Sequence, residues 1–129
     1  MAIARQHGLL IIVDAAYAYL AEQRPPPLAA LTPESTIYVS GLSKNVASGL
    51  RFGFVALPTR FIEAFERAIH ATTWNTPARM TAIATGWLND GTVARLETEK
   101  RVDARRRQTL ARNVLDGFDA IGHLASYFL

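Results

Sequence analysis

Residues 36–57 read Thr-Ile-Tyr-Val-Ser-Gly-Leu-Ser-Lys-Asn-Val-Ala-Ser-Gly-Leu-Arg-Phe-Gly-Phe-Val-Ala-Leu. This stretch holds two short apolar runs, 36–40 and 52–57, whose length and content of β-branched and aromatic residues are typical of strands. A loop rich in glycine and serine, residues 41–49, separates them. The first run indicates a buried strand, as in a parallel sheet, and Pro58 closes the second. The stretch therefore predicts a strand, a polar loop and a second strand.

Upstream of this stretch the sequence predicts one more strand. Leu9 to Val13 is a continuous apolar run that ends at Asp14, and its composition again suits a strand buried on both faces. Residues 2–7 resemble the last turn of a helix that Gly8 caps. Three consecutive prolines, 25–27, predict an extended loop before the lysine-bearing stretch.

Downstream the apolar residues recur at helical spacing. Three helices are expected, one on the stripe Phe61, Phe65 and Ile69, one on Met80, Ile83, Trp87 and Leu88, and one over about 92–118. These stripes are interpreted as core packing. One helix turn, three strands and then helices indicate an α/β fold, with any site at the strand ends.

Composition limits the classes of function. The 129 residues contain no cysteine, which excludes disulfides and thiolate chemistry, and three scattered histidines give no metal-ligand spacing. The net charge of +3 comes largely from residues 100–107, but acidic residues are interleaved there. A solvated helix face explains this run better than a nucleic-acid contact. No apolar run has the length of a membrane span, so we expect a soluble, cytoplasmic protein without metal, nucleic-acid or membrane contacts.

Two clusters at predicted strand ends carry chemistry. The first is Asp14-Ala15-Ala16-Tyr17, and the second runs from Ser40 to Gly53. Within the second, Lys44 and Arg51 stand seven residues apart in a loop rich in glycine and serine. Such a loop is suited to binding phosphate by charge and backbone N–H groups. A Walker loop is excluded because Ser43 stands where glycine should precede the lysine.

The two clusters together resemble the aminotransferase class I and II family. Its pattern is a strand ending in Asp-x-x-Tyr and, about thirty residues on, Ser-Lys followed by Gly-x-Arg-x-Gly. The matching residues here are Asp14, Tyr17, Ser43, Lys44, Gly49, Arg51 and Gly53. The resemblance implies part of the large domain of fold type I, a mostly parallel sheet flanked by helices, with pyridoxal 5'-phosphate (PLP) as cofactor.

The resemblance also implies residue roles. Lys44 is the catalytic lysine that forms a Schiff base with PLP. Asp14 faces the pyridine nitrogen and Tyr17 the phenolic oxygen. Arg51 binds the phosphate, and Ser40 and Ser43 are further cofactor-binding residues.

Each role has a structural alternative. Asp14 is also suited to capping a short helix, Tyr17 to packing beside Tyr19, and Arg51 to pairing with a surface carboxylate. One position departs from the family, because Gly41 stands three before the lysine, where a hydroxyl residue is usual. Either Ser40 takes over that contact from a shifted backbone, or the phosphate loses it.

The resemblance extends over most of the chain, but family members are about three times longer. We therefore expect a piece truncated at both ends, with residues 1–119 from the PLP-binding large domain and 120–129 beginning the small domain. The expected function is amino transfer between an amino acid and a 2-oxo acid, by a protein that is a homodimer in its full-length form. The alternatives are the PLP-sensing domain of a GntR/MocR-type transcriptional regulator, which the prolines before the lysine strand and the helix 99–108 also resemble, and a degenerate fragment without cofactor.

Overall fold

A three-stranded mixed sheet forms the centre of the computed structural model, which describes residues 2–119 and 121–128. Its order is β1 (Ile11–Asp14), β2 (Thr36–Gly41) and β3 (Gly53–Ala56). β1 and β2 run parallel, with Ile11 opposite Thr36 and Asp14 opposite Val39. β2 and β3 run antiparallel, with Gly41 opposite Gly53. The predicted α/β class with three strands is confirmed, and the antiparallel β3 makes the sheet mixed.

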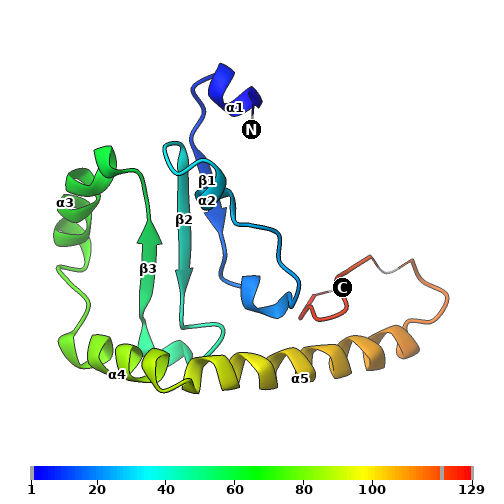
Figure 1. The fold of residues 1–129 in the computed structure, drawn as a ribbon. Coiled ribbons are helices and arrows are strands. Elements are labelled where there is room, and N and C mark those ends of the chain that lie inside the picture. The colour runs from blue at the N-terminus through cyan, green and yellow to red at the C-terminus, as the bar shows by residue number, and fades with distance from the viewer. Residues whose placement is uncertain (1, 120, 129) are drawn as a thin grey trace.

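Helices surround this sheet along one side and across one end (Figure 1). The α-helices are α1 (Ala2–Gln6), α2 (Leu28–Leu31), α3 (Ile62–Thr72), α4 (Ala78–Asn89) and α5 (Thr92–Val114). Short 3-10 helices are η1 (Ala18–Leu20), η2 (Ser48–Leu50) and η3 (Thr59–Phe61). In Figure 1 the long helix α5 runs across the end of the sheet from which the loop after β2 leaves.

The helix limits follow local signals in the sequence. Gly8 ends the first helical turn with φ +60°, as its predicted capping role requires. Gly91 precedes α5 with φ +81°, and the Asp90 carboxylate accepts the Thr92 N–H at 2.9 Å. α5 ends at Val114, four residues before the predicted limit, and α2 was not predicted.

Buried hydrophobic side chains form two small clusters, one of which includes the loop after β2. Leu42 and Leu50 pack with Ala84 of α4 and Val93 of α5, and Met80 and Trp87 lie against them. Tyr19 and Leu20 of η1 pack with Ala104 of α5 and with Ala125. The loop is therefore fixed at both its ends by apolar contacts with α4 and α5.

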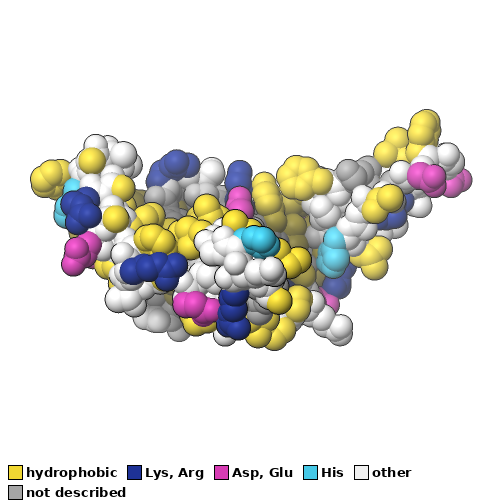
Figure 2. Space-filling view, turned by 90° about the horizontal axis from the view of Figure 1, so that it is seen from above, with side chains coloured by type: hydrophobic (Ala, Val, Ile, Leu, Met, Phe, Trp, Pro, Cys, Tyr) yellow, Lys and Arg dark blue, Asp and Glu magenta, His cyan; other side chains and the backbone are white. Residues whose placement is uncertain are grey.

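The prediction that the apolar strands and stripes are buried was wrong at several positions. The side chain of Ile12 in β1 is 68% exposed, and α3 has no buried residue. Phe118, the last residue of the third predicted stripe, is 75% exposed. Hydrophobic side chains accordingly appear among charged ones across the face shown in Figure 2. A three-stranded sheet of this length has too little covering structure to bury both of its faces.

The C-terminal residues 121–128 follow α5 without a helix or strand of their own. The Gln108 side chain holds them, because its Nε2 donates to the carbonyl oxygens of Ser126 at 3.0 Å and Phe128 at 2.7 Å. The domain division expected between 119 and 120 stays a prediction, since residue 120 lies outside the described residues. No helix of the described part is long and apolar enough to cross a membrane.

A candidate cofactor site at the strand ends

The carboxyl ends of β1 and β2 lie side by side because these strands are parallel and in register. Asp14 is the last residue of β1, and Ser40 and Gly41 end β2. The loop from Leu42 to Phe52 leaves at this edge and returns through η2 into β3. In open α/β sheets such an edge is where ligands bind.

A cavity of about 290 Å³ opens at this edge. It brings together five of the six predicted site residues, namely Asp14, Ser40, Ser43, Lys44 and Arg51. The remaining lining comes from Ala16, Val39, Gly41, Phe52 and Gly53. One carboxylate, two hydroxyls, one amine and one guanidinium therefore face a single hollow, although Asp14 and Lys44 are thirty positions apart in sequence.

Tyr17, the sixth predicted residue, lies beside this cavity rather than in its wall. It lines a neighbouring hollow of about 670 Å³ that shares Asp14 with the first. The Lys44 Nζ stands 5.9 Å from the centre of the Tyr17 ring. The ring also contacts Phe128 in a T-shaped arrangement, with centroids 5.4 Å apart. Tyr17 therefore packs against Phe128, a contact that was not predicted.

The Asp14 carboxylate is directed by its own turn. Its Oδ1 accepts the backbone N–H of Ala16 at 3.0 Å, the geometry of an Asx turn. It does not cap η1, whose N-cap is Tyr17 without a side-chain hydrogen bond. The capping alternative for Asp14 is therefore wrong, and Oδ2 has no hydrogen-bond partner among the described residues.

Arg51 has a backbone conformation that is costly for a residue with a Cβ. Its φ of 48° and ψ of 33° are left-handed, which costs about 1–2 kcal/mol in a residue other than glycine. The side chain is exposed and makes no ion pair within the described part of the chain, so the surface-carboxylate alternative finds no support. Strained residues of this kind cluster at ligand sites.

Gly41 explains why the usual hydroxyl is missing from the position three before the lysine. A Cβ on Gly41 would lie 2.8 Å from the backbone oxygen of Phe52 and 3.1 Å from the Cα of Gly53. Both atoms belong to the paired β3 side, so neither can rotate away. A serine does not fit this backbone, whereas Ser40, one position earlier, lines the cavity.

Three residues that hold the loop were not identified from the sequence. The Tyr19 hydroxyl and the Lys100 Nζ both donate to the carbonyl oxygen of Lys44, at 3.1 and 2.9 Å. The Glu97 carboxylate accepts from Asn45 Nδ2 at 2.7 Å. The separations exceed fifty residues for both α5 contacts, and no local pattern signals them. Lys100 and the neighbouring Arg101, interpreted above as part of a solvated face, are half-buried instead.

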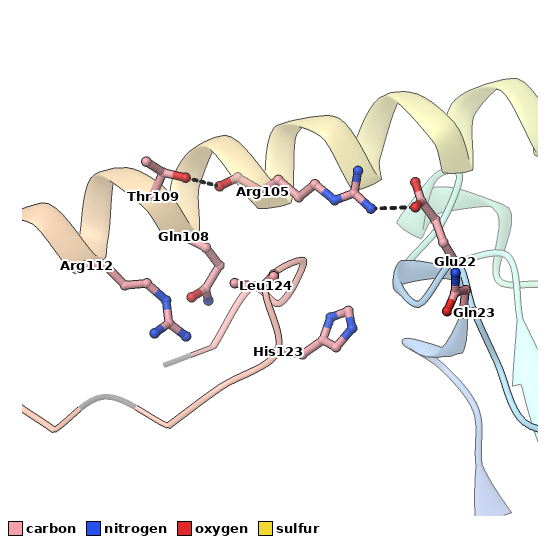
Figure 3. Close-up of a pocket in the computed structure, with 8 residues that line it drawn as sticks. All are labelled: Glu22, Gln23, Arg105, Gln108, Thr109, Arg112, His123 and Leu124. Carbon is pink, nitrogen blue, oxygen red and sulfur yellow. Dashed lines mark hydrogen bonds and ion pairs between the residues drawn. The ribbon is translucent and has the colours of Figure 1, made fainter.

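Another hollow, of about 540 Å³, lies between α5 and residues 121–128 (Figure 3). Figure 3 shows Arg105 reaching from α5 toward Glu22, with which it forms a 2.7 Å ion pair. The hydrogen bond and charge of Arg105 lower the pKa of the Glu22 carboxyl. None of the predicted site residues lines this hollow. Arg112 at its edge donates a hydrogen bond to the carbonyl oxygen of Gly122 at 3.0 Å, which ties the C-terminal segment to α5.

Comparisons with known proteins agree on one family. A family model described as aminotransferase class I and II matches residues 1–129. A transcriptional regulator of the HTH type from Bacillus subtilis, YdeF, is 31% identical over 116 residues, which cover 88% of this chain and 23% of that protein. An aminotransferase of Saccharolobus solfataricus is 32% identical over 112 residues, which cover 84% of this chain and 28% of that protein.

Solved structures show the same fold. The aromatic aminotransferase of Pyrococcus horikoshii is 28% identical with a TM-score of 0.81, over 89% of this chain and 32% of that one. The α-aminoadipate aminotransferase LysN of Thermus thermophilus, at 22% identity, has a TM-score of 0.75 over 88% of this chain and 31% of that one. The chain thus spans about a quarter of the length of the curated relatives and about a third of these structures.

Proposed function

The chain belongs to the aminotransferase class I and II family, and from this membership we propose that the cavity at the ends of β1 and β2 binds PLP. In the whole protein this site would transfer an amino group between an amino acid and a 2-oxo acid. The observation that carries the proposal is the meeting of Asp14, Lys44 and Arg51 at one cavity. Their chemistry fits the cofactor, because PLP needs an amine for its aldehyde, an acid for its pyridine nitrogen and a cation for its phosphate.

Each residue has a defined task in this proposal. The Lys44 amine holds the cofactor covalently and, once released, carries the proton at the substrate Cα. The Asp14 carboxylate holds a proton on the pyridine nitrogen, and Oδ2 is the oxygen left for it because Oδ1 bonds Ala16. Tyr17 donates to the phenolic oxygen from beside Lys44. When bound, PLP supplies an aldehyde for amino groups and a ring that accepts an electron pair.

The phosphate would lie among Arg51, Ser43 and Ser40. The planar guanidinium of Arg51 is suited to bidentate contact with phosphate oxygens. The left-handed backbone of Arg51 supports this role, since strained backbone conformations cluster at ligand sites. Ser40 lines the cavity and is proposed to take the contact that Gly41 cannot make.

A direct test is PLP binding by the purified chain, followed by the visible absorbance of the bound cofactor. We expect saturable binding that Arg51→Ala and Asp14→Ala each weaken at least tenfold, since each removes a charge-assisted hydrogen bond. Arg106→Ala is the control, because this exposed arginine of α5 lies outside the cavity. Equal affinities for all four proteins would refute the site.

A second function is favoured by one observation, the 31% identity to a transcriptional regulator. In that reading the same cavity binds PLP in order to sense it. A single-turnover assay separates the two functions. Release of a 2-oxo acid from any of a panel of amino acids by the PLP-loaded chain supports the enzyme, while tight binding without release supports the sensor. The cytoplasmic location and the homodimeric state of the full-length protein are proposed from the family alone.

A further inference from the structure

The carbonyl oxygen of Lys44 is held by two donors from distant parts of the chain. The Tyr19 hydroxyl donates to it from η1 at 3.1 Å, and the Lys100 Nζ donates from α5 at 2.9 Å. Tyr19 is 4% exposed and belongs to the cluster with Leu20 and Ala104, so its hydroxyl has a fixed position. Burial raises the pKa of Tyr19 above its ordinary value of 10.0, so the hydroxyl remains a donor even in mildly alkaline solution.

Asn45, the residue after Lys44, is also held by α5. Asn45 is 7% exposed, and its Nδ2 donates to Glu97 of α5 at 2.7 Å. Glu97 and Lys100 lie three positions apart, on one face of α5. A second contact ties α5 to η1, since Arg101 Nη1 donates to the Tyr19 carbonyl oxygen at 2.9 Å.

These contacts fix a plane of the backbone. The atoms of the peptide bond between Lys44 and Asn45 are coplanar. Hydrogen bonds to the Lys44 carbonyl oxygen and from the Asn45 side chain hold this plane from both ends. The backbone at Lys44 is therefore oriented, and with it the direction of the Lys44 side chain. Its own side chain remains exposed at the cavity, with Nζ 5.9 Å from the Tyr17 ring centre.

We propose that Lys100 and Tyr19 are positioning residues for Lys44, which orient it toward the cavity by holding its carbonyl oxygen. The inference rests on the proposed function, in which Lys44 reacts with the aldehyde of PLP. In that reaction the amine condenses with the aldehyde and loses one water, and borohydride then delivers a hydride to leave a stable secondary amine. A misdirected lysine reacts more slowly, because rates depend steeply on the orientation of the reacting groups.

The chain suits a test by labelling, because Lys44 and Lys100 are its only lysines. Purified variants are mixed with sub-saturating PLP, trapped with borohydride at timed intervals, and the label at Lys44 is quantified by peptide mapping. We expect Lys100→Met and Tyr19→Phe to slow labelling of Lys44 about three- to tenfold, the scale of one lost hydrogen bond. Lys100→Arg keeps a donor and should stay within about twofold of the unchanged chain.

Controls separate positioning from charge and from loss of fold. Arg106→Met removes one positive charge from the same helix at an exposed residue and should label at the original rate. Tyr19→Phe changes no charge, so a matching loss in that variant excludes a field effect. Circular dichroism and the melting temperature show whether each variant is folded. If Lys100→Met does not fold, the comparison of Lys100→Arg and Tyr19→Phe with the unchanged chain still tests the inference.

Amide hydrogen exchange is the second measurement and needs no cofactor. The amides of Val46 and Ala47 both bond the Leu42 carbonyl oxygen, at 3.0 and 3.1 Å, and should exchange faster in Lys100→Met and Tyr19→Phe. The inference would be overturned if Lys100→Met and Tyr19→Phe label Lys44 and exchange these amides at the rates of the unchanged chain. It would also be overturned if Arg106→Met slows the labelling of Lys44 as much as they do. If the unchanged chain fails to label at Lys44, the proposed function falls, and the exchange data alone then decide whether the two residues hold the loop.

Discussion

Replacing Gly41 by alanine should destabilise the chain, although the position lies at the mouth of a cavity. The added Cβ would stand 2.8 Å from the Phe52 oxygen, about 0.6 Å inside the 3.4 Å at which ordinary contact begins, and 3.1 Å from the Gly53 Cα. Relief by rotation is impossible because both atoms are backbone. The Leu42 N–H donates to the same Phe52 oxygen at 3.0 Å, so moving β3 away weakens this bond too.

The expected loss is about 1–3 kcal/mol of unfolding free energy, the range for an added methyl group in a packed position. Gly49→Ala is the matched control, because no atom lies within 4 Å of its Cβ. That change should be neutral or stabilise by up to about 1 kcal/mol, since alanine restricts the unfolded chain. Urea titrations of both variants give their unfolding free energies, provided that the dependence on urea concentration has the same slope as in the unchanged chain. Equal stability of Gly41→Ala and Gly49→Ala would refute the close approach of β2 and β3, and Gly41→Ser should behave like Gly41→Ala.

Further changes test other parts of the site. Because the pKa of Tyr19 is higher in the folded chain than its ordinary 10.0, folding favours the protonated phenol. The contribution of Tyr19 to the unfolding free energy is complete below pH 10 and declines above it by about 1.4 kcal/mol per pH unit. In urea titrations at alkaline pH, the unfolding free energy of Tyr19→Phe should therefore fall less steeply with pH than that of the unchanged chain. Arg51→Gly should keep the unfolding free energy within about 1 kcal/mol, as glycine accepts the left-handed backbone, yet weaken PLP binding at least tenfold; unaltered affinity would exclude the phosphate role. Asn45→Ala should cost about 1–3 kcal/mol because it leaves the half-buried Glu97 carboxylate without its donor. Asp103→Ala, which removes an exposed ion pair with Arg107, should cost under about 1 kcal/mol, and similar losses in both variants would argue against the loop contact.

The sequence predicted the parts of this molecule that depend on local chemistry. The strand ends near Asp14 and Ser40 and the cap at Gly8 follow from residue types at fixed spacing. The cofactor roles of the loop residues, which came from the family resemblance, stay predictions. Tyr17 was predicted at the site and lies beside the cavity, since its place depends on the turn into η1 and on Phe128. Lys100 and Glu97 were missed because their partners lie more than fifty residues away.

Burial was the weakest part of the prediction. A continuous apolar run such as Leu9 to Val13 indicates a strand but not how much structure covers it. Ile12 is 68% exposed because the described residues place nothing over that face of β1. The contact between Gly41 and β3 likewise depends on the register of two strands, which residue types alone do not determine.

Whether Lys44 holds PLP is decided by site-resolved labelling of the purified chain. The chain and its Lys44→Arg variant would be incubated with PLP, reduced with borohydride and digested for peptide mapping by mass spectrometry. We expect one cofactor per chain on the peptide containing Lys44, with Lys100 unlabelled because its Nζ donates to the Lys44 carbonyl oxygen, and no label in the variant. Label shared between Lys44 and Lys100, or retained in Lys44→Arg, would contradict this expectation.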